Sequence, residues 1–120
     1  MDTNLVLRDG SSSLTGDETL TTIKIGPMTR PLWLHVLVPS VSSGDVLDVE
    51  LEFCTAGAPT TEVYNMNMAQ ITVAGHYAIP FYTKEPYLQV KLNETDNGGP
   101  NFGATKVWID NANRYSNPIS

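Results

Sequence analysis

VLDVELEFC, residues 46–54, is the stretch of this sequence that indicates the fold most directly. Apolar and acidic side chains alternate along it with a period of two, which is the period of a β-strand buried on one face. A slip of one residue would bury the carboxylates, so the register of this strand is strongly determined. We therefore predict a strand with apolar residues facing inward and an acidic face made of Asp48, Glu50 and Glu52.

Further short strands are predicted on both sides of this stretch, separated by clusters of Gly, Pro, Asn or Ser. No stretch has the 3.6-residue period of an amphipathic helix. About eight strands without helices in a chain of 120 residues predict one all-β domain, a two-sheet antiparallel sandwich of jelly-roll type. The predicted strands are residues 19–25, 32–38, 46–54, 62–68, 70–73, 76–82, 87–92 and 104–110.

The sequence divides into three parts, of which the sandwich domain is residues 19–110. Residues 1–18 are interpreted as an extended N-terminal arm and turn, which lies along the domain or reaches a neighbour. Residues 111–120 are polar and are interpreted as a C-terminal tail. The residues of the arm that we expect to make contacts are Asn4, Leu5, Val6, Leu7 and Arg8.

Residues 32–38 break the alternation expected of a half-solvated strand, because both of their faces carry apolar side chains. The second face is therefore expected to be covered by the arm or by another subunit. A tryptophan in the last predicted strand also lies opposite the core side of its strand, and tryptophan is enriched at interface hot spots. We predict that an oligomer interface contains Trp33, His35, Leu37 and Trp108.

Composition argues against several classes of function. The net charge of −6 and the isolated positions of the 7 Lys and Arg residues argue against binding nucleic acid through phosphates. No apolar run approaches the ~20 residues of a membrane helix, so no membrane partner is expected. The one cysteine, Cys54, excludes an intrachain disulfide, and no signal peptide is visible, so synthesis in a cytoplasm is expected.

No catalytic residue, metal site or cofactor is predicted. His35 and His76 are far apart in the sequence and form no paired-histidine motif, and the alternative is a mononuclear site made of both and a carboxylate such as Asp48. Cys54 is interpreted as a small semi-buried residue rather than a nucleophile. The oxygen-rich loop at residues 93–99 lacks the spacing of a calcium-binding EF-hand loop.

The acidic face could also be interpreted as paired carboxylates for glycoside hydrolysis, but no apolar pocket is evident that would raise one pKa. It is expected to be solvated or to meet a basic group, either Lys91 or Lys106 on an adjacent strand or residues of another protein.

Several segments in order resemble the small jelly-roll cement (decoration) proteins of tailed bacteriophages. The resemblance covers most of the chain, although this chain is short and lacks a larger insertion between its middle strands. The segments are Asn4-Leu5-Val6-Leu7-Arg8-Asp9-Gly10, Arg30 to Pro39, Asp45 to Phe53, and Phe102 to Asp110.

This resemblance implies a structural virion protein without an active site. Such proteins form dimers or trimers on the exterior of an HK97-type capsid shell and clamp neighbouring subunits of the major capsid protein. For this chain it implies synthesis in a host bacterial cytoplasm, a place on the capsid exterior, and contact of the arm with the shell or a neighbour. The alternatives are another virion component, from the tail or the head-completion machinery, and a carbohydrate-binding β-sandwich that uses Trp108, Tyr82 or Tyr87 for stacking.

Overall fold

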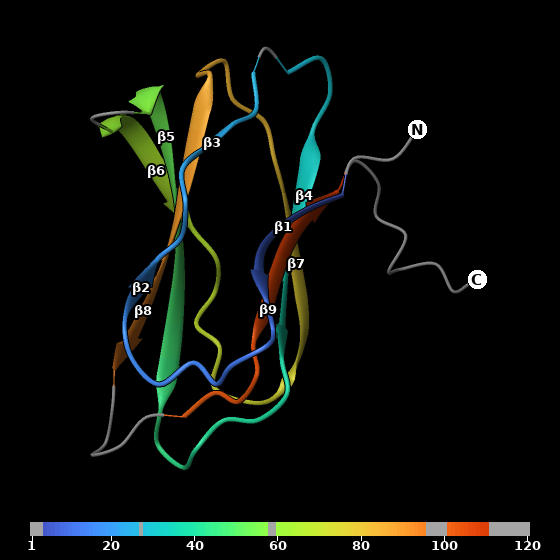
Figure 1. Cartoon of the computed structure of the whole chain (residues 1–120), viewed down its shortest axis with the longest axis vertical. Helices are drawn as coiled ribbons and strands as arrows, with labels where there is room; N and C mark the ends of the chain where they lie inside the picture. The colour runs from blue at the N-terminus through green and yellow to red at the C-terminus, as the bar shows by residue number, and fades with distance from the viewer. Residues whose placement is uncertain (1–3, 27, 58–59, 96–100, 111–120) are drawn as a thin grey trace, which may run out of the picture.

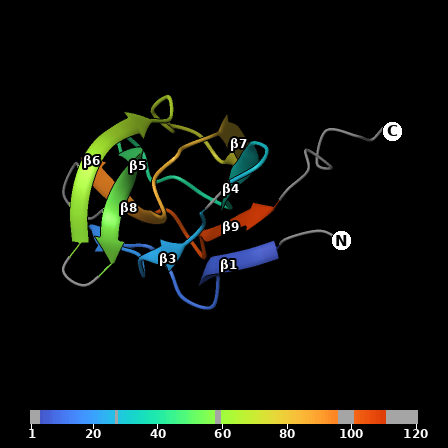
Figure 2. The ribbon, with the colours of Figure 1, turned by 90° about the horizontal axis from the view of Figure 1, so that it is seen from above.

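The computed structural model describes residues 4–26, 28–57, 60–95 and 101–110. These residues form two antiparallel sheets and no helix, and the sheets pack face to face as two layers (Figure 1, Figure 2). The predicted all-β sandwich is therefore confirmed. Since no helix occurs in these ranges, none of them contains a helix that could span a membrane.

Sheet A has four strands in the order β1-β9-β4-β7. Proline lacks the N–H that a central strand must donate, so Pro80 predicts an edge strand or a bulge. The edge position of β7 confirms this prediction. The strands of sheet A are β1 (Asn4–Asp9), β4 (Leu32–Val38), β7 (Gly75–Phe81) and β9 (Lys106–Asp110).

Sheet B has five strands in the order β2-β8-β5-β6, with β3 also paired to β8. The strand expected at residues 19–25 is divided between β2 and β3. The prediction of a strand at residues 70–73 is wrong, because this segment contributes only one isolated bridge, between Leu47 and Ile71. The strands of sheet B are β2 (Glu18–Thr19), β3 (Ile23–Lys24), β5 (Val46–Gly57), β6 (Thr60–Asn67) and β8 (Tyr87–Thr95).

The strand pairs are nested in the manner of a jelly roll. β5 pairs with β6, β4 with β7, β2 and β3 with β8, and β1 with β9, so the chain folds back on itself from the middle outward. The additional pairs β4–β9 and β5–β8 complete the two sheets. This nesting is the topology that the jelly-roll prediction requires.

The core lies between the two sheets. The inward residues of β5 are fully buried, as the alternation of residues 46–54 predicts: Leu47, Val49, Leu51 and Phe53. Two further core residues, Leu14 and Phe102, come from segments where no strand was predicted. The backbone N–H groups of Leu14 and Phe102 donate to the carbonyls of Gly103 and Leu14, which ties these segments together across one end of the sandwich.

Residues 4–9, which the sequence assigns to an arm, form the edge strand β1 along β9, with a bulge between Val6 and Arg8. The segment therefore lies along its own domain, the first of the two arrangements expected for the arm. The predicted tail at residues 111–120 lies outside the described residues, as does most of the tip of the loop that was weighed for calcium.

Candidate functional site: the outer face of sheet A

The residues predicted for an oligomer interface lie together on the outer face of sheet A. Directly opposed residues of antiparallel strands project from the same face. His35 of β4 opposes Trp108 of β9, and Leu37 of β4 opposes Lys106. We call this surface the A face; it is made of Val6, Trp33, His35, Leu37, His76, Ala78, Pro80, Lys106, Trp108 and Asp110.

Apolar side chains of the A face are open to solvent. Leu37 is 41% exposed and Val6 is 49% exposed, while Trp33 and Trp108 are half-buried. A surface of this kind, rimmed by polar groups, is typical of a site of protein contact. It is the feature that the doubly apolar pattern of residues 32–38 predicts.

His35 differs from the other predicted interface residues because it is buried within its own chain, with 1% of its surface exposed. Its ring stacks on Trp108, with centroids 4.9 Å apart and an angle of 4° between the planes. Lys106 covers another part of the Trp108 ring, with Nζ 5.3 Å from the centroid. His35 is therefore covered by its neighbours on the A face, with the Trp108 ring stacked against its side.

A row of polar groups crosses the A face from β9 to β7. His35 Nε2 lies 3.1 Å from Asp110 Oδ1, and His35 Nδ1 lies 3.0 Å from His76 Nε2. Burial lowers the pKa of His76, the nearby His35 lowers it further, and Asp110 acts in the opposite direction. Both histidines are therefore held in one hydrogen-bonded arrangement with a carboxylate at one end.

Sequence reasoning missed this arrangement, because His35 and His76 are 41 residues apart. They meet because β4 and β7 pair antiparallel in a register that opposes Leu37 to His76 and His35 to Ala78. The carboxylate that we associated with them, Asp48, lies in sheet B, and Asp110 of β9 occupies the place beside His35 instead. One indication of a shared surface was present in the sequence, because His35 and Trp108 both lie opposite the core side of their strands.

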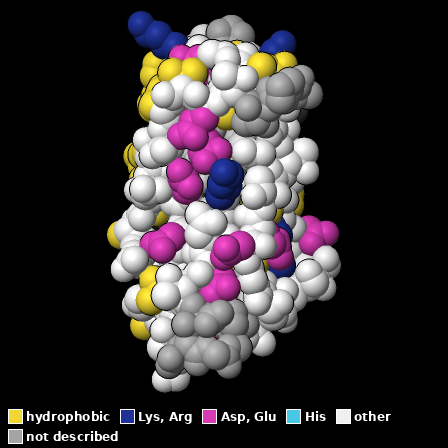
Figure 3. All heavy atoms as spheres, turned by 90° about the vertical axis from the view of Figure 1, so that its left-hand side faces the viewer, with side chains coloured by type: hydrophobic (Ala, Val, Ile, Leu, Met, Phe, Trp, Pro, Cys, Tyr) yellow, Lys and Arg dark blue, Asp and Glu magenta, His cyan; other side chains and the backbone are white. Residues whose placement is uncertain are grey.

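The acidic face predicted on β5 lies on the outer face of sheet B, where Asp and Glu side chains gather (Figure 3). Glu52 is only 5% exposed, so the expectation that it is solvated is wrong. It forms an ion pair with Lys91 of β8 at 3.1 Å, which is one of the two lysines expected to meet this face. Lys106, the other one, lies in sheet A.

Glu62 of β6 joins the acidic face, and carboxylate oxygens of Glu50, Glu52 and Glu62 lie within 4.8 Å of one another. Burial raises the pKa of Glu50, and the charges of Glu52 and Glu62 raise it further. The positive charge of Lys91 acts in the opposite direction and lowers the pKa of Glu50. The structure therefore explains the face as a cluster of carboxylates around one lysine.

Cys54 at the end of this strand is fully buried. Burial raises the pKa of its thiol, and the charges of Glu52 and Glu62 act in the same direction. A buried thiol with a raised pKa is a poor nucleophile. This agrees with the interpretation of Cys54 as a small packing residue.

The predicted contact residues of the arm do not act alike. Leu5 is 39% exposed and remains available on the edge strand, as does Val6. Arg8 turns inward after the bulge and is 9% exposed. Its guanidinium donates to the carbonyls of Ser12 and Thr105, each at 2.8 Å, and to the Glu18 carboxylate at 2.9 and 3.1 Å. Arg8 is thus a structural residue of this domain.

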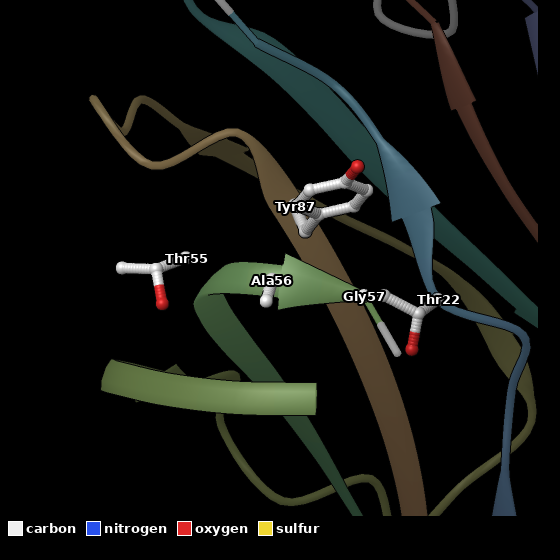
Figure 4. A pocket seen from close by; sticks show the side chains of 5 residues that line it. All are labelled: Thr22, Thr55, Ala56, Gly57 and Tyr87. Atoms are coloured by element: carbon white, nitrogen blue, oxygen red, sulfur yellow. The ribbon is translucent and has the colours of Figure 1, made fainter. Parts of the chain in front are cut away.

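Tyr87, one of the three proposed stacking residues, lines a hollow (Figure 4). The hollow is open to solvent, with a volume of about 520 Å³, and its wall is formed by Thr22, Thr55, Ala56, Gly57 and Tyr87. Trp108 belongs to sheet A, and the Tyr82 hydroxyl donates to the carbonyl of Met28 at 3.3 Å. The three aromatic residues therefore do not form one binding platform.

Comparison with known proteins adds information about the fold. No protein-family model matches this chain, and no curated protein matches it. A chain from the structure of infectious bursal disease virus, Gx strain, matches with a TM-score of 0.58 and 12% identity, over 92% of this chain and 32% of that one. A chain from the Gt strain structure matches with a TM-score of 0.56 and 12% identity, over 96% of this chain and 33% of that one.

This chain shares its fold with chains of a virus. It spans about a third of the length of those chains, and at 12% identity the likeness shows the fold alone. The likeness therefore agrees with the two-sheet sandwich that the described residues form. The A face and the acidic face are properties of this chain's own side chains.

Proposed function

We propose that this chain is a structural virion protein, which decorates the exterior of a capsid and stabilises it by clamping neighbouring subunits of the major capsid protein. The observation that carries the proposal is the shared fold with chains from virus structures over 92% and 96% of this chain. The resemblance to phage cement proteins supports an HK97-type shell as the surface that is decorated. The proposed role is a non-catalytic one.

The A face supports a role in contact with other protein. It presents Leu37 and Val6 beside two half-buried tryptophans, and aromatic anchors of this kind dominate the energetics of many interfaces. We propose that this surface, together with the exposed Leu5 of β1, packs against a second copy or a capsid subunit. Assembly as a dimer or trimer would present several such faces at once, so that modest contacts add through multivalency.

The charge of the chain supports the same role. Its net charge of −6 and the carboxylates on sheet B would favour a basic patch of a shell and would be repelled by packaged nucleic acid (Figure 3). The proposed location is therefore the capsid exterior, reached after synthesis in the host cytoplasm.

The proposal is tested by locating the chain in purified particles of the virus that encodes it. Antibody labelling of intact particles, followed by cryo-electron microscopy, is expected to place the chain on the outer surface next to the major capsid protein. Absence of the chain from purified particles, or labelling only after the shell is opened, would overturn the proposal.

A matched pair of variants tests the A face. Leu37→Asp puts a charge into the proposed contact, while Val73→Asp changes a residue that is 64% exposed and lies outside this face. Particles decorated with the Leu37 variant are expected to lose the chain at lower salt or temperature than particles with the Val73 variant. Equal retention of both variants would show that the A face is not the contact surface.

A second candidate, carbohydrate binding, is favoured only by the hollow beside Tyr87, whose lining includes one aromatic ring and the two threonines Thr22 and Thr55 (Figure 4). A glycan array compares the natural chain with Tyr87→Ala, and with Tyr82→Ala as the control at an exposed tyrosine outside the hollow. Binding that is lost only in the Tyr87 variant would support this candidate, and an array without binding would exclude it.

A further inference from the structure

The two histidines of the A face have the spacing of ligands to one metal ion. His35 Nδ1 and His76 Nε2 face each other at 3.0 Å. Two imidazole nitrogens that bind the same Zn²⁺ at tetrahedral geometry are separated by roughly 3.3 Å. An ion at this separation lies to one side of the line between the two nitrogens, so binding requires the exposed His76 ring to shift by a few tenths of an ångström and to tilt until both lone pairs point at the ion.

The surroundings of His35 match those of a metal-binding histidine. Histidine ligands usually donate their second ring N–H to a carboxylate, which fixes the tautomer and the orientation of the ring. Here Asp110 Oδ1 lies 3.1 Å from His35 Nε2, so a proton on Nε2 would leave the Nδ1 lone pair directed at His76. The stacked Trp108 ring holds the imidazole in place from the side.

We propose that His35 Nδ1 and His76 Nε2 bind one divalent transition-metal ion of the Zn²⁺, Ni²⁺ or Cu²⁺ class, with Asp110 as the residue that orients His35. Imidazole nitrogen is a preferred ligand of these ions. His76 is exposed and belongs to the edge strand β7, so the remaining coordination positions face outward from the A face. Water would occupy them in the isolated chain. This inference goes beyond the proposed function and stands without it.

The carboxylates on sheet B are the competing cation site. Glu50, Glu52 and Glu62 converge, but Lys91 Nζ already lies 3.1 Å from Glu52. Carboxylate oxygens also favour Ca²⁺ and Mg²⁺, whereas the two imidazoles favour the transition metals. The two sites can therefore be separated by choice of ion and by variants.

The test is a calorimetric titration of the chelator-treated full chain with ZnCl₂. The informative variant is His76→Phe, which keeps an aromatic ring at an exposed position and removes its nitrogens. Since the chain has only 2 histidines, this variant removes one of the two ligands that the proposal requires. Circular dichroism verifies that each variant is folded. Glu62→Gln, on the competing site, is the matched control.

We expect one Zn²⁺ per histidine pair, at least tenfold weaker binding in His76→Phe, and binding weakened by about 10- to 100-fold in Asp110→Asn. Glu62→Gln is expected to bind as the natural chain does. Unchanged affinity in His76→Phe, or loss of binding in Glu62→Gln, would overturn the assignment.

Tryptophan fluorescence gives an independent measurement. Trp108 lies 4.9 Å from the ring of His35 and 5.2 Å from that of His76, so Cu²⁺ bound between them would quench its emission at contact distance. The quenching is expected to persist in Trp33→Phe and to disappear in His76→Phe. A folded His76→Phe chain that is quenched at the same Cu²⁺ concentration as the natural chain would contradict the proposal.

This result is independent of where the chain is found. A chain that binds Zn²⁺ through His76 but is missing from virus particles would retain the metal site and lose the proposed virion role. A chain that is located on particles but does not bind Zn²⁺ would retain the proposed virion role and lose the metal site.

Discussion

Replacing Arg8 by alanine is expected to lower the free energy of unfolding by about 3 kcal/mol. Arg8 follows the bulge of β1, and its buried side chain connects this strand to two other segments. Its guanidinium donates to the carbonyl of Thr105, just before β9, and to the carbonyl of Ser12 in the turn that follows β1. It also holds the carboxylate of Glu18 in β2.

The expected magnitude follows from how buried each contact is. The bond to the Thr105 carbonyl is buried, and a hydrogen bond from a charged donor contributes about 1.5–3 kcal/mol. The bond to Ser12 is partly buried and contributes less. The Glu18 side chain is 37% exposed, so solvent screens this ion pair and limits its contribution to at most about 1 kcal/mol. Most of the loss therefore comes from leaving the Thr105 carbonyl without its donor.

Urea denaturation followed by circular dichroism measures the change. Arg30→Ala is the matched control, because Arg30 is exposed and its replacement is expected to change the free energy of unfolding by less than about 0.5 kcal/mol. Equal stability of the Arg8 and Arg30 variants would refute the reasoning, and would return Arg8 to the set of residues available for contact with a neighbour.

Three further predictions concern the core, a turn and the acidic face. Leu51→Ala should cost about 2–5 kcal/mol in urea denaturation, because the residue is fully buried between the sheets. Gly103→Ala should lower the melting temperature, because φ is +72° there and an added Cβ would lie 2.8 Å from Cγ of Pro39; a normal melting curve would contradict this. Glu50 has a raised pKa, so it binds a proton more readily in the folded chain than in the unfolded one. Stability should therefore fall as the pH rises from 4.5 through that raised pKa, and Glu50→Gln should abolish the fall; an unchanged pH profile would count against the carboxylate cluster.

The alternation of apolar and polar residues within single segments was enough to predict the main strands and which of their faces is buried. The alternation in residues 46–54 places Leu47, Val49, Leu51 and Phe53 in the core because a period of two is a property of neighbouring residues. The same reasoning places Trp33, Leu37 and Trp108 on one outer surface, as the structure shows. Glu52 also faces outward as predicted, but Lys91 on the next strand covers it.

Other features depend on which distant strands pair and in what register. A bulge that no local pattern marks turns Arg8 inward, and the closing turn of the sandwich draws Leu14 and Phe102 into the core. Residues 70–73 have the composition of a strand but find only one bridging partner. Whether a segment of this composition forms a strand depends on the strands and side chains that it packs against. Those neighbours are distant in the sequence, so the local sequence does not reveal them.

The sequence by itself determined an all-β sandwich, the inward and outward faces of its main strands, and an apolar outer surface around Trp33 and Leu37. Only the tertiary structure decided that His35, His76 and Asp110 meet. They lie on three strands, and their separation of 3.0–3.1 Å depends on the pairing of β4 with β7 on one side and β9 on the other. Register across a sheet is set by the packing of whole strands against the core, so no spacing within the chain could reveal it.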